Sequence, residues 1–302
     1  MSCKILLCDP IPDTVKNRLE AAGHHVDVKH GMSPEELAEV IAPYAGVVVR
    51  SATKVRQVAI DKAENLKVIV RGGVGIDNID HEYARSKGIS VRNTPTATSN
   101  SVAELAMGHM FSLARHIPEG TMTLRNGEWA KKQLKGTELL GKTLGLIGIG
   151  RIGAELAKKA LALGMDVIAY DLYVTESPVE GVKLVSQDEV LANADYISLH
   201  IPFDKEKGAA VGTAEFAKMK DGVYLVNCAR GGVVDEDAML AALDNGKLAG
   251  AGIDVFIGEP TPRPDVVGHP KVFCTPHVGA STAEGQDRVA DLVVEVLLEE
   301  LG

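Results

Sequence analysis

The sequence predicts an α/β protein built from two doubly wound, parallel-sheet domains. Its 302 residues are more than one hydrophobic core usually organises, so two domains are expected. Short, continuous apolar runs alternate with amphipathic segments, which is the pattern of buried parallel strands and crossover helices. Aromatic residues make up only 4% of the chain, so aliphatic side chains must fill the cores.

The first third of the chain contains five apolar runs with strand character and helical segments between them. Because the runs are apolar throughout rather than alternating, each strand is expected to be covered on both faces. The predicted strands are 4–8, 26–28, 46–50, 66–70 and 89–91, and the clearest helices are 12–22 and 34–41.

The second third repeats this alternation with clearer helix limits. Asp235 is placed to cap a helix over 236–245 that Gly246 ends, and Gly164 ends a helix over 151–163. The predicted strands are 143–147, 167–170, 196–199, 223–227, 249–253 and 272–274.

Two long helical segments connect these halves. A segment over 99–116 leads from the first sheet to the second, and a run over 282–301 follows the second sheet. Because that last run has no strand left to join, it can return to the first sheet. We therefore expect a discontinuous domain at 1–98 and 283–302 with a second domain at 99–282 inserted in it.

The formal net charge of −9, with no long basic run, argues against a nucleic acid or an anionic membrane as partner. Cys3, Cys8, Cys228 and Cys274 form no CxxC pair and are expected to be reduced, and we predict no metal site. The N-terminus lacks signal-peptide layout, and no apolar stretch approaches the ~20 residues of a membrane helix. A cytoplasmic enzyme is expected.

A glycine-rich turn predicts a dinucleotide site. Gly148, Gly150 and Gly153 form G-x-G-x-x-G directly after a predicted strand and before a predicted helix. The helix N-terminus would offer N–H groups to a pyrophosphate. Asp171 ends the next strand, about 20 residues further on, where a carboxylate binds the adenosine ribose. Because this carboxylate would repel a 2′-phosphate, NAD is predicted rather than NADP.

Three polar residues of the same domain lie just beyond consecutive strand ends: Arg230, Glu259 and His277. Each alone has an ordinary structural explanation, as a backbone contact, a loop cap or a buried imidazole. Their joint placement, where open α/β sheets bind their ligands, instead predicts one shared site.

Four segments resemble the D-2-hydroxyacid dehydrogenase family, most closely its D-3-phosphoglycerate dehydrogenase branch. They are Asn-Cys-Ala-Arg-Gly-Gly at 227–232, Pro-His-Val-Gly-Ala-Ser-Thr at 276–282, and the loops at 48–55 and 71–78. The resemblance implies a Rossmann NAD-binding domain (99–282) inserted in a flavodoxin-like substrate-binding domain (1–98 and 283–302).

The resemblance also implies residue roles. Arg230 would bind the substrate carboxylate and polarise the 2-oxo group, and His277 would act as general acid/base, oriented by Glu259. Asp254 would lie near the nicotinamide carboxamide. The implied cofactor contacts are Gly148, Gly150, Arg151, Ile152, Gly153, Asp171, Ile201, Cys228, Ala229, Arg230, Asp254, His277, Gly279, Ala280 and Val74.

The preferred substrate is 3-phospho-D-glycerate, oxidised to 3-phosphohydroxypyruvate in the first step of serine biosynthesis. Backbone N–H groups of Gly73, Val74 and Gly75 would receive the carboxylate, and Arg50 with Ser51 suits a phosphate. Alternatively, Arg50 makes a salt bridge and the enzyme is a glyoxylate/hydroxypyruvate reductase or another D-2-hydroxyacid dehydrogenase. A more remote alternative is a non-enzymatic, NAD-sensing corepressor, which would not need the intact catalytic residues.

Two departures from the family pattern stand out. The loop at 203–208 is atypical, so no role is assigned to its side chains. The sequence carries no serine-sensing regulatory domain, so feedback inhibition through such a module is not expected.

The family resemblance implies a homodimer through the NAD-binding domain, with Trp129 on an arm that could reach the partner. Hinges are expected near 97–100 and 281–284.

Overall fold

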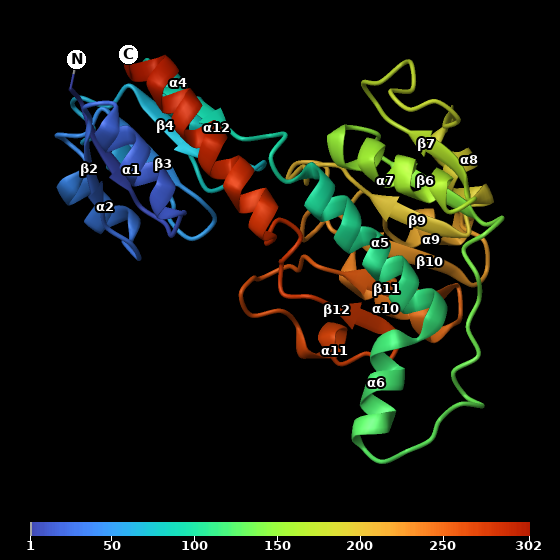
Figure 1. Cartoon of the computed structure of the whole chain (residues 1–302). Helices are drawn as coiled ribbons and strands as arrows, with labels where there is room; N and C mark the ends of the chain where they lie inside the picture. The colour runs from blue at the N-terminus through green and yellow to red at the C-terminus, as the bar shows by residue number, and fades with distance from the viewer. Residues whose placement is uncertain (1) are drawn as a thin grey trace. The chain divides into compact units, whose positions relative to one another are not determined.

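The computed structural model describes residues 2–302, and its contacts divide the chain into two compact units (Figure 1). Unit 1 comprises Met1–Thr98 and Ala280–Gly302, and unit 2 comprises Ser99–Gly279. The chain thus returns to unit 1 three residues before the predicted limit at 282/283.

Unit 1 is built on a five-stranded sheet in the order β2-β1-β3-β4-β5, in which every pair of neighbours is parallel. This is the flavodoxin-like strand order. The strands are β1 (Lys4–Leu7), β2 (His25–Val28), β3 (Gly46–Val49), β4 (Val68–Arg71) and β5 (Ser90–Asn93).

Helices cover both faces of this sheet because its side chains are apolar on both sides. Val15 of α1 and Val293 and Leu297 of α12 pack with Ile5 and Val70 in one cluster. The other face forms a separate cluster that includes residues of α2, α3 and α4. The helices are α1 (Asp13–Ala21), α2 (Pro34–Val40), α3 (Gln57–Ile60), α4 (His81–Ser86) and α12 (Ala283–Leu301).

Unit 2 is built on a seven-stranded parallel sheet in the order β12-β11-β10-β9-β6-β7-β8. Counted within the unit, this is the Rossmann order extended by one strand at one edge. The strands are β6 (Thr143–Ile147), β7 (Asp166–Tyr170), β8 (Lys183–Leu184), β9 (Tyr196–Leu199), β10 (Val223–Asn227), β11 (Leu248–Ile253) and β12 (Val272–Cys274).

The helices of unit 2 also lie in two layers. Those of one face are α5 (Ser99–Arg115) and α7 (Arg151–Ala162), and their small residues let the layers approach closely. A Cβ at Gly252 of β11 would lie 2.6 Å from the Cβ of His109 on α5. The opposite face carries α8 (Gln187–Asn193), α9 (Thr213–Lys218), α10 (Glu236–Asp244) and α11 (Pro264–Val267).

One helix of unit 2 belongs to neither layer. Helix α6 (Ile117–Arg125) and the segment after it project away from the sheet (Figure 1), and no residue of Ile117–Arg125 is buried.

The predicted fold class is confirmed: both units are parallel-sheet α/β structures with helices on both faces. In the described part of the chain, no helix is long and apolar enough to cross a bilayer.

Candidate active site

The glycine-rich turn of unit 2 joins β6 to α7. Gly148 has a positive φ of 95°, and a Cβ there would lie 2.5 Å from the carbonyl oxygen of His200. A Cβ at Gly153 would lie 2.3 Å from the carbonyl oxygen of Gly148. A Cβ at Gly150, the N-cap of α7, would meet no described atom within 4 Å. Gly148 and Gly153 are therefore needed for close packing. Gly150 leaves open space before the helix N-terminus, and this space fits a pyrophosphate.

Asp171 lies beside this turn at the end of β7. Its Oδ2 accepts a hydrogen bond from the backbone N–H of Ile149 (2.9 Å), and its Oδ1 accepts from Tyr173 (2.9 Å) and Val174 (3.2 Å). The carboxylate is thereby fixed in place. Because each carboxylate oxygen has two lone pairs, Asp171 can still accept from a ribose hydroxyl.

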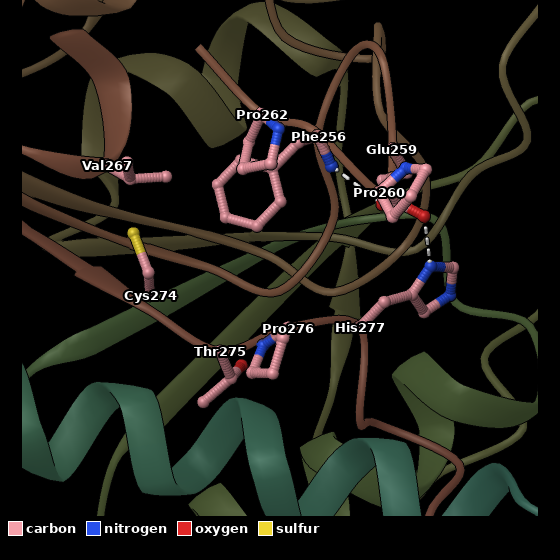
Figure 2. Close-up of a pocket in the computed structure, with 9 residues that line it drawn as sticks. All are labelled: Phe256, Glu259, Pro260, Pro262, Val267, Cys274, Thr275, Pro276 and His277. Carbon is pink, nitrogen blue, oxygen red and sulfur yellow. Dashed lines mark hydrogen bonds and ion pairs between the residues drawn. The ribbon is translucent and has the colours of Figure 1, made fainter. Parts of the chain in front are cut away.

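His277 and Glu259 form a hydrogen-bonded pair beyond the ends of β12 and β11 (Figure 2). His277 Nδ1 lies 2.6 Å from Glu259 Oε2, and Glu259 Oε1 accepts from the backbone N–H of Phe256 at 2.8 Å. Burial raises the pKa of Glu259, but the bonds from His277 and Phe256 and the charges of His277 and Arg230 outweigh this and lower it. Glu259 is therefore held as a carboxylate beside the imidazole.

A second carboxylate steadies the loop that carries Glu259. Glu236, a buried residue of α10, accepts the backbone N–H of Ile257 at 3.0 Å. Consecutive N–H groups, of Phe256 and Ile257, are thus bound by two different glutamates. Sequence reasoning missed Glu236 because an acidic residue in the first turn of a helix usually needs no other explanation.

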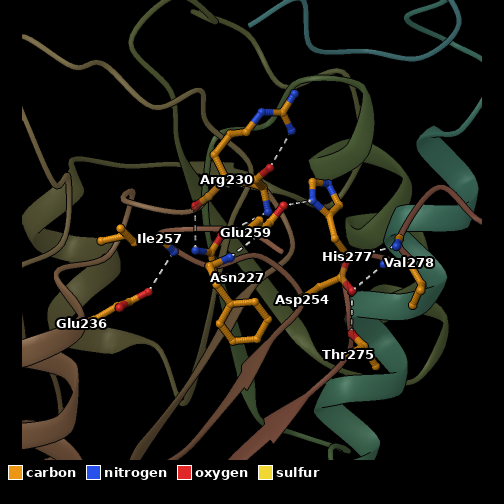
Figure 3. Close-up of polar contacts among 12 residues, drawn as sticks. Asn227, Arg230, Glu236, Asp254, Ile257, Glu259, Thr275, His277 and Val278 are labelled. Atoms are coloured by element: carbon orange, nitrogen blue, oxygen red, sulfur yellow. Dashed lines mark hydrogen bonds and ion pairs between the residues drawn. The ribbon is translucent and has the colours of Figure 1, made fainter. Parts of the chain in front are cut away.

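Arg230 lies in the turn after β10, with its side chain in the region of Glu259 and His277 (Figure 3). The Asn227 side chain shapes this turn by donating to the carbonyl of Arg230 (3.0 Å) and accepting from the N–H of Ala229 (3.0 Å). A Cβ at Gly231 would lie 2.1 Å from the carbonyl oxygen of Phe256, so the two loops are in direct contact. The structure brings Arg230, Glu259 and His277 together.

Asp254, at the end of β11, anchors the loop that carries His277. It is 1% exposed and accepts from the hydroxyl of Thr275 (2.6 Å) and from the N–H groups of Val278 (2.8 Å) and Gly279 (2.9 Å). Its carbonyl accepts the N–H of His277 at 2.9 Å. Sequence reasoning gave Asp254 a cofactor contact but did not foresee this anchoring.

A pocket of 280 Å³ lies on one side of the Glu259–His277 pair (Figure 2). Burial raises the pKa of the Cys274 thiol in its wall to about 11, so this cysteine is a weak nucleophile. The other lining residues are Phe256, Pro260, Pro262, Val267, Thr275 and Pro276.

The remaining predicted cofactor contacts of unit 2 lie at the same edge of the sheet. Arg151 and Ile152 open α7, Ile201 follows β9, and Cys228 and Ala229 follow β10. Gly279 lies against Asp254, whereas Ala280 and Val74 belong to unit 1.

The predicted substrate residues of unit 1 follow β3 and β4. The N–H of Arg50 donates to the buried carboxylate of Asp9 at 2.5 Å, and its Nη1 donates to the carbonyl of Pro10 at 3.0 Å. Burial lowers the pKa of Arg50, against the opposing effect of the Asp9 charge. Ser51 is exposed in the same loop. Asn78 ties this loop to the second by donating to the carbonyl of Arg50 at 2.9 Å.

The second loop contains an arginine to which sequence reasoning gave no role. Gly73 has a φ of 146°, and a Cβ there would lie 1.4 Å from Nη1 of Arg71. The guanidinium therefore occupies the space that any side chain at residue 73 would need. Val74 and Gly75 continue the loop. The sequence signal for Arg71 was its place at the end of a strand beside a glycine pair.

Comparison with known proteins identifies relatives over nearly the whole chain. Residues 107–279 match the model of the NAD-binding domain of D-isomer specific 2-hydroxyacid dehydrogenases. The chain is 48% identical to a hydroxypyruvate reductase of Thermotoga maritima, over 95% of this chain and 92% of the relative. It is 47% identical to a D-3-phosphoglycerate dehydrogenase of Methanocaldococcus jannaschii, over 97% of this chain but only 56% of the relative.

The fold has close relatives among solved structures. A glyoxylate reductase from Paecilomyes thermophila aligns with a TM-score of 0.91 at 32% identity, over 99% of this chain and 95% of the other.

Proposed function

Because the chain belongs to the D-isomer specific 2-hydroxyacid dehydrogenases, NAD-dependent oxidoreductases that act on small 2-hydroxy acids, we propose that it oxidises 3-phospho-D-glycerate to 3-phosphohydroxypyruvate. The observation that carries the chemistry is the 2.6 Å hydrogen bond between His277 and Glu259, beside Arg230. The intact and mutually close Arg230, Glu259 and His277 favour an enzyme over the non-enzymatic corepressor alternative, which would not need them.

The turn of unit 2 would hold the cofactor. Gly148, Gly150 and Gly153, with the first turn of α7, suit the pyrophosphate, and Asp171 suits the adenosine ribose. When bound, NAD supplies the acceptor for the hydride that leaves C2 of the hydroxy acid. The protein supplies alignment and the proton path.

His277 would be the general acid/base. Its Nδ1 is bonded to Glu259, so Nε2 is the nitrogen that would take the hydroxyl proton as C2 is oxidised. The products are then the 2-oxo acid, the reduced cofactor and an imidazolium stabilised by the Glu259 carboxylate. In the reverse direction the same Nε2 returns the proton. Arg230 would bind the substrate carboxylate and polarise the 2-oxo oxygen.

The phosphate preference rests on unit 1. Arg50 and Arg71 both flank the glycine loop, since a Cβ at Gly72 would lie 3.4 Å from Cγ of Arg50 and one at Gly73 would overlap Arg71. Guanidinium groups bind phosphate through paired hydrogen bonds, and the N–H groups of Gly73, Val74 and Gly75 would receive the carboxylate. This reaction would supply serine biosynthesis in the cytoplasm.

A second candidate, reduction of hydroxypyruvate or glyoxylate, is favoured by two observations. One relative that is matched over 92% of its length is a hydroxypyruvate reductase. In addition, Arg50 Nη1 already donates to the carbonyl of Pro10, which gives the guanidinium a structural role without a phosphate.

A substrate panel decides between the two candidates. We would compare kcat/KM for 3-phosphoglycerate, D-glycerate and D-lactate with NAD, and for hydroxypyruvate and glyoxylate with NADH. We expect the largest oxidative value for 3-phosphoglycerate. Efficient reduction of hydroxypyruvate together with no oxidation of 3-phosphoglycerate would establish the second candidate instead.

We also propose that the chain forms a homodimer through unit 2. The arm formed by α6 and residues up to Trp129 exposes apolar side chains: Ile117 (53%), Met122 (54%), Leu124 (60%) and Trp129 (80%). Covering them with a second copy would remove this apolar surface from water. Light scattering should give twice the mass of one chain, and Leu124→Ser with Trp129→Ser should give the single mass.

A further inference from the structure

A buried histidine in unit 2 has no part in the proposed reaction. His109 is 4% exposed and lies on α5, among apolar neighbours on the same helix such as Ala106 and Met110. A leucine or methionine would fill this position without burying two ring nitrogens, so the polar atoms of His109 call for a partner.

That partner is Thr275, in the segment that leads from β12 to His277. His109 Nε2 lies 3.1 Å from Oγ1 of Thr275, and Oγ1 lies 2.6 Å from Oδ1 of Asp254. A carboxylate only accepts, so the single hydroxyl proton of Thr275 is donated to Asp254. The hydroxyl oxygen must then accept from His109, which requires the proton of His109 to be on Nε2.

The protonation state of His109 agrees with this direction. Burial lowers the pKa of His109, although the negative charge of Asp254 acts in the opposite direction. At neutral pH the ring is therefore uncharged, and the hydrogen bond to Thr275 selects its Nε2–H tautomer.

Asp254 in turn holds the loop that carries His277 in place. Through Val278, Gly279 and the N–H of His277 it holds the backbone on both sides of the imidazole. His277 has a φ of 53°, a left-handed conformation that costs about 1 kcal/mol for a non-glycine residue. A loop in such a conformation keeps it only where neighbouring contacts hold it.

We propose that His109 is a positioning residue of the active site: through Thr275 it orients the Asp254 carboxylate, which holds His277 where it meets both Glu259 and the substrate. The residue acts without touching substrate or cofactor. This inference rests on the proposed acid/base role of His277.

The experiment compares His109→Leu, which fills the volume without a donor, with His109→Gln, whose side-chain amide can restore an N–H toward Thr275. We expect kcat of the Leu variant to fall about 10-fold, the usual effect of one lost hydrogen bond within a charged network. The Gln variant should recover kcat to within about 3-fold of the wild type. Met110→Leu, a core change on the same helix, should leave kcat unchanged.

A purely structural role makes a different prediction. It predicts that the Leu variant keeps its kcat and that the Gln variant, with a polar group in an apolar layer, is the worse of the two. That result would overturn the inference. Thr275→Val breaks the same chain one step later, so adding His109→Leu to it should lower kcat by less than twofold further.

One measurement is independent of turnover. Spectra of ¹⁵N-histidine-labelled protein, compared with those of His109→Leu, should show His109 as a neutral ring protonated at Nε2. Protonation at Nδ1 would overturn the inference whichever substrate is used. Failure of every 2-hydroxy acid as substrate would instead contradict the proposed function, and the tautomer would still show whether His109 donates to Thr275.

Discussion

Each unit has a glycine-rich turn after an interior strand of its sheet, β4 in unit 1 and β6 in unit 2, yet the two turns use their glycines differently. In unit 2, Gly150 leaves open space before a 12-residue helix that begins at the next residue. In unit 1, the space beside Gly73 is filled by the Arg71 guanidinium, and the next helix, α4, begins only at His81.

The two proposed anion sites would therefore be prepared in different ways. The turn of unit 2 offers the N–H groups of a helix N-terminus, which suit a pyrophosphate at fixed geometry. The turn of unit 1 instead makes room for the Arg71 guanidinium. Another side chain could replace this arginine without disturbing a helix, because the next helix begins only at His81. We therefore expect cofactor binding to depend on unit 2 and substrate choice on unit 1.

The largest effect should come from the chemistry of unit 2. His277→Ala removes the proposed acid/base, so kcat should fall by at least about 1,000-fold. NADH affinity, followed by fluorescence titration, should stay within about threefold because the glycine turn is unchanged. Near-normal turnover would refute the assignment of His277.

The next effect tests the open space at Gly150. Its φ is −65°, so Gly150→Val is compatible with the backbone, and the fold should keep its stability. The added side chain would enter the pyrophosphate space, so the Kd for NADH should rise about 100-fold. Gly153→Val is the contrast, because its Cβ would meet the backbone of Gly148 and lower the melting temperature. Unchanged NADH binding in Gly150→Val would show that the space is not the cofactor site.

A smaller and selective effect is expected in unit 1. Arg50→Ala should lower kcat/KM for 3-phosphoglycerate about 30-fold, as one charged hydrogen-bonding partner is lost. It should change kcat/KM for hydroxypyruvate less than threefold. Lys54→Ala, an exposed neighbour, is the matched control. Equal losses on both substrates would mean that the Arg50 side chain only shapes its loop, through its hydrogen bond to the Pro10 carbonyl.

The smallest effect is a pH dependence at Glu259. Its pKa in the folded chain is lowered from the ordinary 4.5, so its contribution to stability is present above that value. The contribution is lost as the pH falls through the lowered pKa. The melting temperature of Glu259→Gln should therefore be below that of the wild type at pH 7, and the gap should close at lower pH. A gap that stays constant down to pH 3 would contradict the lowered pKa.

The sequence predicted the strands of both units well because buried parallel strands are continuous apolar runs. The predicted limits of β6, β9, β10 and β12 agree with the structure. Helix α6 was missed because none of its residues is buried, so its sequence lacks the pattern of a helix that packs on a core. Strand β8 was missed because two edge residues carry no pattern. Helix α8 was not predicted either, although the capping box of Ser186 and Glu189 could have indicated where it begins.

The candidate site was predictable where residues follow strand ends, as Arg230, Glu259 and His277 do. The residues that hold this site in place could not be predicted, because they bind partners that only the packing of the folded chain brings close to them. Glu236 and His109 are 21 and 166 residues from their partners Ile257 and Thr275. In the sequence, His109 is one polar residue in an apolar helix. The close contact between α5 and β11 at Gly252, which places the His109 side chain against the second sheet, is visible only in the structure.

The return of α12 to unit 1 has a consequence for biosynthesis. Val289, Val293 and Leu297 belong to the core of the first sheet, but they leave the ribosome after all of unit 2 has been made. Until α12 is made, α1 is the helix available from this cluster to cover that face of the first sheet, while unit 2 can complete its own core. We therefore expect unit 1 to be completed after unit 2, the opposite of the usual N-terminal-first order.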